Sequence, residues 1–214
     1  MSNLLFVGLG NPDARYAGTR HNFGADTIRA WVETMRSQVE VTDWQADSKV
    51  QADVAQVRLS SLQHTDQQSS SAVSRFLVLL RPATSDTITI HCVIPTTGMN
   101  KSGDAVVSYL NQHPLENHDV TLVHDDLELA LGQHRYVTGG SARGHNGVRS
   151  IHTQLNDQNI GRLRLGIGRP EGEMPVDKYV LSKFTSEEQQ VANTVMRQAG
   201  LQLTRIAQRP SPLT

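Results

Sequence analysis

The fold class follows from the stretch Leu4-Leu5-Phe6-Val7-Gly8-Leu9-Gly10-Asn11-Pro12. A short apolar run that is closed by glycines and an Asn-Pro pair is typical of a buried strand ending in a turn. Further along the chain, Ile28, Val32 and Met35 recur at helical spacing, and the pattern ends at about residue 37. We therefore expect the chain to open with a strand, a loop and a helix.

The remaining periodic segments alternate between the two kinds of element. Strands are predicted at 76–80, 87–94, 120–124 and 163–167, and helices at 102–111, 146–155 and 185–208. The last helix opens with the capping-box pattern Thr185-x-x-Glu188. Pro82 and the Ser85-Asp86 pair separate the first two of these strands, which we expect to form a hairpin. This order predicts an α/β fold, a single-domain three-layer sandwich with a twisted mixed β-sheet flanked by helices.

Length and composition limit the domain organisation and the location of the protein. The 214 residues are expected to form one domain over 1–214, with a Ser/Gln-rich surface insertion at about 60–74. The longest apolar run, 76–80, is too short to cross a membrane. The single cysteine, Cys92, cannot form an intrachain disulfide, and no targeting pattern precedes residue 4. We therefore expect a cytoplasmic protein.

The charge of the chain is unevenly distributed. The net charge of −1 argues against a generally basic nucleic-acid-binding protein. Residues 132–169, however, combine one acidic residue, Asp157, with six arginines: Arg135, Arg143, Arg149, Arg162, Arg164 and Arg169. Guanidinium groups suit phosphate because their planar fork donates two hydrogen bonds at once. The cluster indicates a polyanionic partner, and the alternative is an ordinary solvated surface.

Four polar segments follow predicted strands or precede predicted helices. They are residues 19–24, 95–103, 124–128 and 139–147. Ligands bind at the edge of an α/β sheet where the strands end, so these segments are expected to converge on one pocket. They supply imidazole, carboxylate and amide groups, with no Gly-x-Ser-x-Gly motif and no neighbouring Cys-His pair. A His-Asp pair that activates water, with asparagines as orienting donors, is the chemistry that these groups allow.

Two other kinds of site are disfavoured by the same segments. The stretch that begins at Gly8 starts like a dinucleotide fingerprint, but Asp13 stands at the third glycine position and Pro12 lacks a backbone N–H. The segments also offer only one or two histidines rather than three ligands with metal spacing. We expect no cofactor and no catalytic metal. His21 is expected to present an exposed ring with a pKa near neutrality, as a general base requires.

Seven ordered motifs resemble the bacterial-type peptidyl-tRNA hydrolase family over about residues 4–205. They are Gly8-Leu9-Gly10-Asn11-Pro12, Thr19-Arg20-His21-Asn22, residues 95–103, His124-Asp125-Asp126-Leu127-Glu128-Leu129, Gly144-His145-Asn146-Gly147, residues 162–170 and residues 179–184. The resemblance implies an esterase that cleaves the bond between a peptide and the 3′-terminal ribose of tRNA, and so recycles tRNA from stalled translation.

The resemblance also implies roles for individual residues. His21 would be the general base and Asp125 its orienting partner. The substrate-binding residues would be Asn11, Tyr16, Met99, Asn100, His145 and Asn146. No metal or other cofactor is implied. The partner would be the acceptor end of peptidyl-tRNA, and the protein is expected to be a monomer in the cytoplasm, or in the mitochondrion if its source is eukaryotic.

Three departures from the family pattern concern the first turn and the contacts to phosphate. Many relatives have glycine where this chain has Asp13. The positions of two phosphate-binding lysines are occupied by Val137 and Glu173, and Arg143 stands where bacterial members commonly have glycine, as in eukaryotic relatives. Contacts to tRNA phosphate are therefore expected from arginines instead: Arg135, Arg143, Arg164 and Arg169.

Two alternatives to this function stay open at the level of the sequence. One is a non-catalytic RNA-binding member of the same fold, and the pair His21 and Asp125 weighs against it. The other is a hydrolase of small peptide esters that does not use RNA, and the arginine cluster weighs against it.

Overall fold

The computed structural model of the protein describes residues 2–59 and 87–208. Its strands are β1 (Ser2–Gly8), β2 (Glu40–Val41), β3 (Gln45–Asp47), β4 (Ala52–Leu59), β5 (Ile88–Pro95), β6 (Val120–Asp126), β7 (His134–Thr138) and β8 (Gly161–Gly166). Its α-helices are α1 (Phe23–Arg36), α3 (Ser102–Leu110), α4 (Asn146–Leu155), α5 (Val176–Val180) and α6 (Ser186–Ala207).

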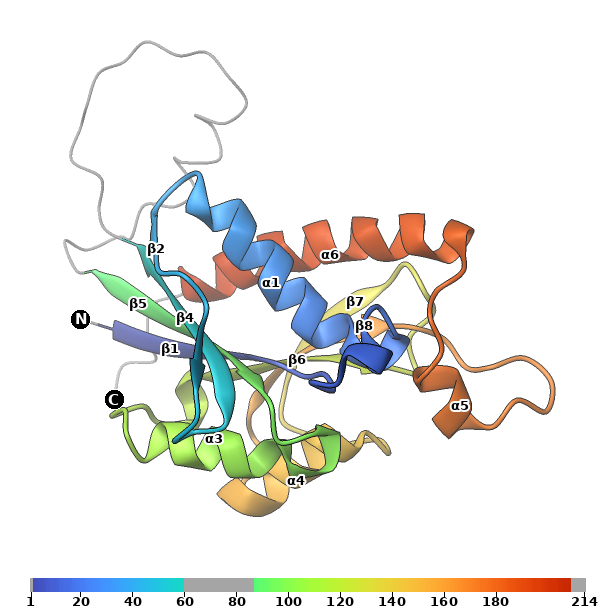
Figure 1. The fold of residues 1–214 in the computed structure, drawn as a ribbon, viewed down its shortest axis with the longest axis horizontal. Helices are drawn as coiled ribbons and strands as arrows, with labels where there is room; N and C mark the ends of the chain where they lie inside the picture. Colours follow the sequence, from blue (N-terminus) through green and yellow to red (C-terminus); the bar gives the residue numbers. More distant parts are fainter. Residues whose placement is uncertain (1, 60–86, 209–214) are drawn as a thin grey trace, which may run out of the picture.

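The strands form one mixed sheet in the order β2-β4-β5-β1-β6-β8-β7, and β3 pairs with β4 at its side. The four central strands β5, β1, β6 and β8 are parallel. The strands toward the edges are antiparallel to their neighbours. Because the central strands are parallel, β1, β5, β6 and β8 all end at the same edge of the sheet, toward the side where α5 lies (Figure 1).

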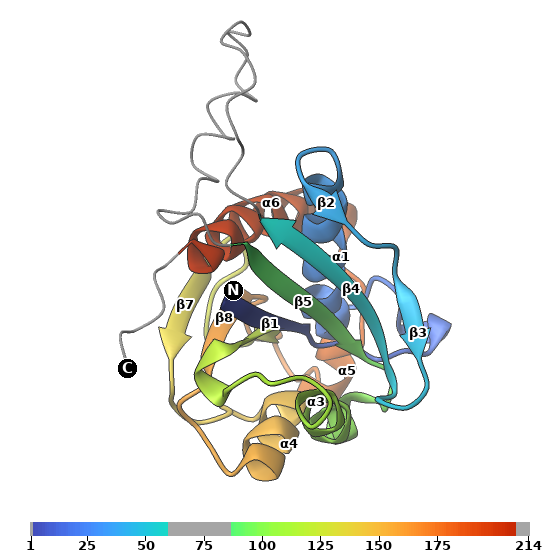
Figure 2. The same ribbon diagram turned by 90° about the vertical axis from the view of Figure 1, so that its left-hand side faces the viewer.

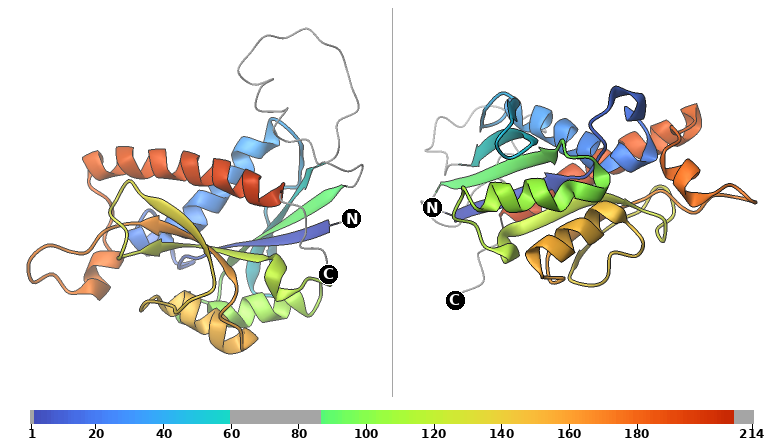
Figure 3. Two further views of the ribbon diagram at one scale, coloured as in Figure 1. Left: turned by 180° about the vertical axis from the view of Figure 1, so that it is seen from behind. Right: turned by 60° about the horizontal axis from the view of Figure 1, so that its bottom comes forward.

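Helices cover both faces of this sheet. Helices α1 and α6 pack together on one face, where the Trp31 indole N–H donates a 3.1 Å hydrogen bond to the Thr204 hydroxyl. Helices α3 and α4 pack together on the other face (Figures 2 and 3). Each face has its own apolar core, one around Phe6 and Ile28 and the other around Leu5 and Ile151. The predicted α/β fold with a mixed sheet between helical layers is confirmed.

A close approach between α1 and the sheet fixes the start of that helix. A Cβ atom at Gly24 would lie 2.1 Å from the carbonyl oxygen of Val123 in β6, so only glycine fits at this position. The backbone N–H of Ala25 donates to the carbonyl of Leu9, which joins the helix to the end of β1 as well. The turn that precedes α1 is thereby held against the ends of two central strands.

Most sequence expectations for the elements are confirmed, but the hairpin is wrong. Strand β5 has β1 on one side and β4 on the other, so neither of its edges is free to pair with residues 76–80. Residues 76–80, like the expected insertion at 60–74, lie outside the described residues. Strands β2, β3, β4 and β7 and helix α5 were not predicted. Among the residues that the structure describes, no helix is both long and apolar enough to cross a membrane.

Candidate active site

A cleft of about 850 Å³ lies at the edge of the sheet where the central strands end. Five segments line it: residues 11–21 after β1, 96–101 after β5, 125–127 at the end of β6, 142–146 before α4, and 176–181 in and after α5. The four segments expected to converge therefore do so. The segment around α5 is an addition that the motifs did not indicate.

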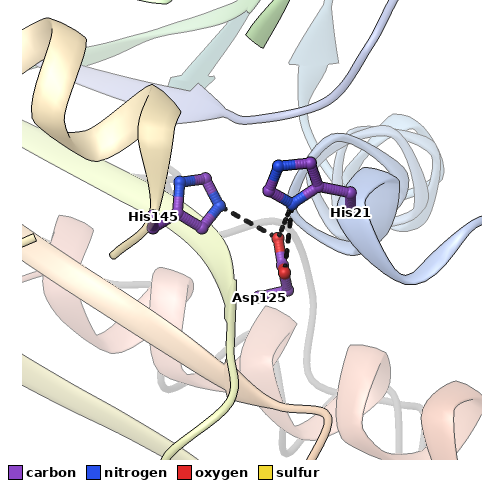
Figure 4. A group of neighbouring side chains, drawn as sticks. All are labelled: His21, Asp125 and His145. Atoms are coloured by element: carbon purple, nitrogen blue, oxygen red, sulfur yellow. Dashed lines mark hydrogen bonds and ion pairs between the residues drawn. The ribbon is translucent and has the colours of Figure 1, made fainter. Parts of the chain in front are cut away.

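His21 and Asp125 are in direct contact at the floor of this cleft (Figure 4). The Nδ1 atom of His21 lies 3.0 Å from Oδ1 and 3.1 Å from Oδ2 of Asp125. His21 comes from the 3-10 turn Arg20–Asn22 before α1, and Asp125 comes from the end of β6. The expectation of an exposed ring is wrong, because only 11% of the His21 side chain is accessible. Figure 4 shows that its other ring nitrogen, Nε2, points away from Asp125.

His145 approaches the same carboxylate from a second side. Its Nε2 lies 3.0 Å from Oδ1 of Asp125, and its ring centre lies 4.7 Å from that of His21. His145 is the N-cap residue of α4, where its Nδ1 accepts a 3.3 Å hydrogen bond from the backbone N–H of Val148. Because Nδ1 acts as an acceptor, Nε2 carries the ring proton and donates a hydrogen bond to Asp125. One carboxylate thus receives hydrogen bonds from two imidazoles.

The surroundings fix the charges in this group. Burial by itself raises the pKa of Asp125, but the charges of His21 and His145 and their hydrogen bonds outweigh it and hold the pKa far below its usual range. Burial lowers the pKa of His21, but the charge of Asp125 and the hydrogen bond to it raise the pKa above its usual value. Burial and the neighbouring His145 lower the pKa of His124 to about 3, so this imidazole is neutral. Asp125 is therefore an anion whose adjacent imidazole is made more basic.

Asn11 is held in the cleft by two neighbours. The backbone N–H of Asn11 donates a 2.8 Å hydrogen bond to Oδ1 of Asn22, whose Nδ2 donates to the carbonyl of Asn11 over 3.1 Å. The side-chain oxygen of Asn11 accepts a 3.1 Å hydrogen bond from the backbone N–H of Met99. This contact orients the amide and leaves its Nδ2 as a donor. Asn22 was not selected as a site residue from the sequence, although it directly follows His21.

The other expected substrate-binding residues also line the cleft. Tyr16 does so with its ring under the guanidinium of Arg15, at 4.8 Å. Met99 is buried in the core on the α3 and α4 face, while Asn100 and Asn146 are exposed. The residues expected for substrate binding thus surround the His21-Asp125 pair.

The four arginines expected to bind phosphate are placed differently. Arg143 lines the cleft, whereas Arg135 and Arg169 are exposed outside it, the latter paired with Glu128. Arg164 is buried, and its Nε donates a 2.6 Å hydrogen bond to Asp126. The expectation that Arg164 contacts phosphate is therefore wrong. If its guanidinium turned toward a phosphate, the buried carboxylate of Asp126 would lose its cation.

The backbone at Arg143 is in a conformation that is unusual for a residue other than glycine. Arg143 has φ of 49°, in the left-handed region that favours glycine. A side chain other than glycine costs about 1–2 kcal/mol in this conformation. Arg143 therefore has an unfavourable backbone conformation, and its guanidinium side chain lines the cleft.

The three clustered side chains also form a metal-type ligand set. His21, Asp125 and His145 each place one potential ligand atom within 4.8 Å of the others. The expectation that the converging segments lack three such ligands is therefore wrong. The same atoms are engaged with one another in hydrogen bonds of 3.0 Å from each imidazole to the carboxylate. A metal ion would have to replace the protons of both hydrogen bonds.

Comparisons with known proteins identify the family of this chain. A family model described as peptidyl-tRNA hydrolase matches residues 5–210. The chain is 38% identical over 194 residues to the peptidyl-tRNA hydrolase of Solidesulfovibrio magneticus. This match covers 91% of this chain and 82% of that protein. The chain is 34% identical over 199 residues to the one from Aquifex aeolicus, covering 93% and 87% respectively.

Solved structures give the same result. A crystal structure of peptidyl-tRNA hydrolase from Acinetobacter baumannii superimposes with a TM-score of 0.73 at 28% identity, and the match covers 96% of this chain and 88% of that one. The resemblance found in the motifs is confirmed. With the family model matching nearly its whole length, this chain belongs to the peptidyl-tRNA hydrolase family.

Proposed function

We propose that this protein hydrolyses the ester bond between the peptide and the 3′-terminal ribose of tRNA in peptidyl-tRNA. Family membership supports the reaction class. The observation that carries the proposal is the contact of His21 with the buried anion of Asp125 at the floor of an open cleft. General-base catalysis requires a histidine oriented by a carboxylate in this way, whereas the binding of RNA alone does not.

In the proposed reaction, Nε2 of His21 takes a proton from a water molecule while the water oxygen bonds to the ester carbonyl carbon. Asp125 accepts a hydrogen bond from the Nδ1–H group of His21, which fixes the tautomer and stabilises the imidazolium that forms. The bond between the carbonyl carbon and the ribose oxygen then breaks, and the ribose oxygen receives the proton from His21. The products are a peptide with a free carboxylate and a tRNA with a free hydroxyl.

The amides around the cleft supply hydrogen-bond donors to this reaction. Because the side-chain oxygen of Asn11 accepts the backbone N–H of Met99, the Nδ2 group of Asn11 is left as a hydrogen-bond donor. Donors of this kind stabilise the negative charge that develops on the carbonyl oxygen. Asn100 and Asn146, exposed on the cleft wall, hold the substrate and the water. The acceptor end is the part of tRNA that the cleft binds, and the active form is a monomer in the cytoplasm.

A single assay tests this function. Purified protein is given an N-blocked aminoacyl-tRNA, the corresponding free aminoacyl-tRNA, and a blocked amino acid ester that lacks tRNA. Release from the blocked aminoacyl-tRNA alone is the expected result. Binding of the tRNA without any release would show a non-catalytic protein, and equal release from the ester lacking tRNA would show a general esterase.

Of the four arginines expected to bind phosphate, Arg143 is the best placed to do so, since among the described residues it alone of the four lines the cleft and it is exposed there. Replacing Arg143 with alanine is expected to raise KM and to leave single-turnover chemistry at saturation nearly unchanged. Each lost phosphate contact reduces the slope of log affinity against log salt by about 0.7 to 0.9. The slope of the Arg143→Ala protein is therefore expected to be smaller by about one.

Arg149→Ala is the matched control for this variant. Arg149 is exposed on α4, belongs to the same arginine-rich segment, and does not line the cleft. The control makes the same change in net charge, so it should keep the KM and the salt slope of the parent. If Arg143→Ala also keeps both values, the phosphate contact belongs to Arg135 or Arg169 instead.

Hydrolysis is expected to proceed without a metal ion. Prolonged incubation with a chelator should leave turnover unchanged, because the protons shared by His21, Asp125 and His145 already satisfy the potential ligand atoms. The measurement compares chelated protein with a sample diluted in parallel. A loss of turnover that zinc restores, and that dilution does not cause, would contradict this expectation.

A further inference from the structure

Arg20 directly precedes His21, yet its side chain is buried away from the cleft, with 4% of the residue exposed. Its Nη1 donates hydrogen bonds of 2.7 Å to the hydroxyl of Ser182 and of 2.6 Å to the carbonyl of Lys183. Its Nη2 donates a 2.6 Å hydrogen bond to Oε2 of Glu188. One guanidinium thus joins the turn that carries His21 to a segment more than 160 residues further along the chain.

Backbone and ring contacts strengthen this junction. The backbone N–H of Arg20 donates a 3.0 Å hydrogen bond to the carbonyl of Ser182, and Thr19 forms an isolated bridge with Lys183. The guanidinium carbon of Arg20 lies 4.3 Å from the ring centre of Tyr179 in α5 and 5.0 Å from that of Phe184. The aromatic faces add an attraction to the cation. The guanidinium is therefore surrounded by the end of α5 and the connection to α6.

Helix α5 depends on such contacts for its position. It has five residues, and none of them is buried. Isolated helices of this length are unstable in water, because nucleation is unfavourable and few backbone hydrogen bonds follow. Yet Val176 and Val180 of this helix, with Leu181 after it, line the cleft. A second link, the hydrogen bond of 2.6 Å from the Tyr179 hydroxyl to the carbonyl of Ile167, attaches the helix to the end of β8.

We propose that Arg20 and Glu188 are a positioning pair that holds α5 in place as a wall of the active-site cleft. Neither residue lines the cleft, so the pair acts through α5 and not by touching the substrate. Glu188 is suited to this role because the same oxygen also accepts the backbone N–H of Thr185, which ties the pair to the first turn of α6. The inference rests on the function proposed above.

The pair should affect the binding of substrate more than the chemical step. If α5 leaves its position at the cleft for part of the time, only the remaining fraction of molecules can bind substrate. The apparent affinity for substrate then falls in proportion to that fraction. Saturating substrate selects the competent form again, so turnover recovers. A wall that is in place in one-fifth to one-tenth of the molecules raises KM about five- to tenfold and leaves kcat within about twofold of the parent.

The test is the isosteric variant Glu188→Gln, which keeps an oxygen for the N–H of Thr185 and removes the charge that faces Arg20. KM for an N-blocked aminoacyl-tRNA is expected to rise about five- to tenfold with kcat within about twofold. The matched control is Glu187→Gln, one residue earlier in the same turn. Glu187 carries the same charge and is exposed, so the control should keep the KM of the parent.

Two further variants separate the pair from the helix cap. Thr185→Ala removes the hydroxyl that caps the N–H of Glu188 and leaves the contact with Arg20, so KM should not change. Ser182→Ala removes another acceptor of Arg20, together with the 2.7 Å hydrogen bond that the same hydroxyl donates to the carbonyl of Tyr179 in α5, without altering any charge, so KM should rise in the same direction as in Glu188→Gln. An unchanged KM in Glu188→Gln, or an equal rise in Glu187→Gln or Thr185→Ala, would overturn the inference.

A measurement that does not require activity separates this inference from the proposed function. Amide hydrogen exchange over residues 176–181 should be faster in Glu188→Gln than in the parent and unchanged in Glu187→Gln. If the parent hydrolyses no ester, the proposed function fails, and the exchange experiment still decides whether the pair holds α5. Equal exchange in all three proteins would show that it does not.

Discussion

Replacing His21 with alanine is expected to lower kcat by about 10²- to 10⁴-fold while KM stays within a few-fold of the parent. The expectation follows from the position of the ring, which contacts Asp125 through Nδ1 and directs Nε2 away from it (Figure 4). Removing the imidazole takes away the group that accepts the proton of the attacking water. The surfaces that bind peptide and tRNA remain, so KM is largely kept.

The measurement is steady-state hydrolysis of an N-blocked aminoacyl-tRNA, with thermal unfolding to establish that the variant is folded. His118→Ala is the control, because its side chain is 54% exposed and lies outside the cleft. Near-normal turnover in His21→Ala would remove His21 from the role of general base. His145, the other imidazole at the same carboxylate, would then be tested next.

The elements that the sequence predicts well are those whose signal is local. The apolar run of β1, the helical spacing in α1 and the capping box of α6 are all present in the structure. Each depends on neighbours within a turn or two of the same segment. The position of β5 between β1 and β4 depends on pairing between distant segments, and a hairpin was predicted in its place. Helix α5 has only five residues, too few to show a helical period, and its Tyr179 contacts the distant residues Arg20 and Ile167.

The candidate site shows the same division. That His21 and Asp125 share one pocket follows from the rule that strand ends meet at one edge of the sheet. The contact of His145 with that carboxylate depends on the N-cap geometry of α4, which a motif does not specify. The sequence shows the charge of Arg164 but not its burial beside Asp126, and it was therefore expected to bind phosphate. The charge of a residue follows from the sequence alone, whereas its burial depends on how the distant strands assemble into the sheet.

The second large effect is expected for Asp125→Asn, which keeps the shape of the side chain and removes its charge. The kcat should fall by about 10²- to 10⁴-fold, because an amide no longer fixes the reactive tautomer of His21 or stabilises its imidazolium. Glu128→Gln makes the same chemical change on an exposed carboxylate three residues away and should keep the rate of the parent. A parent-like rate in Asp125→Asn would assign the orienting role to another group.

The pH profile makes this test independent of the size of the rate loss. In the parent, burial lowers the pKa of His21, and Asp125 reverses this and raises the pKa above its usual value. In Asp125→Asn the burial remains and the anion is gone, so the pKa of His21 falls. A general base works in its neutral form, and its rate declines on the acid side of its pKa. The acid limb of the kcat profile should therefore move to lower pH, and it would stay in place if Asp125 served only the packing of the cleft.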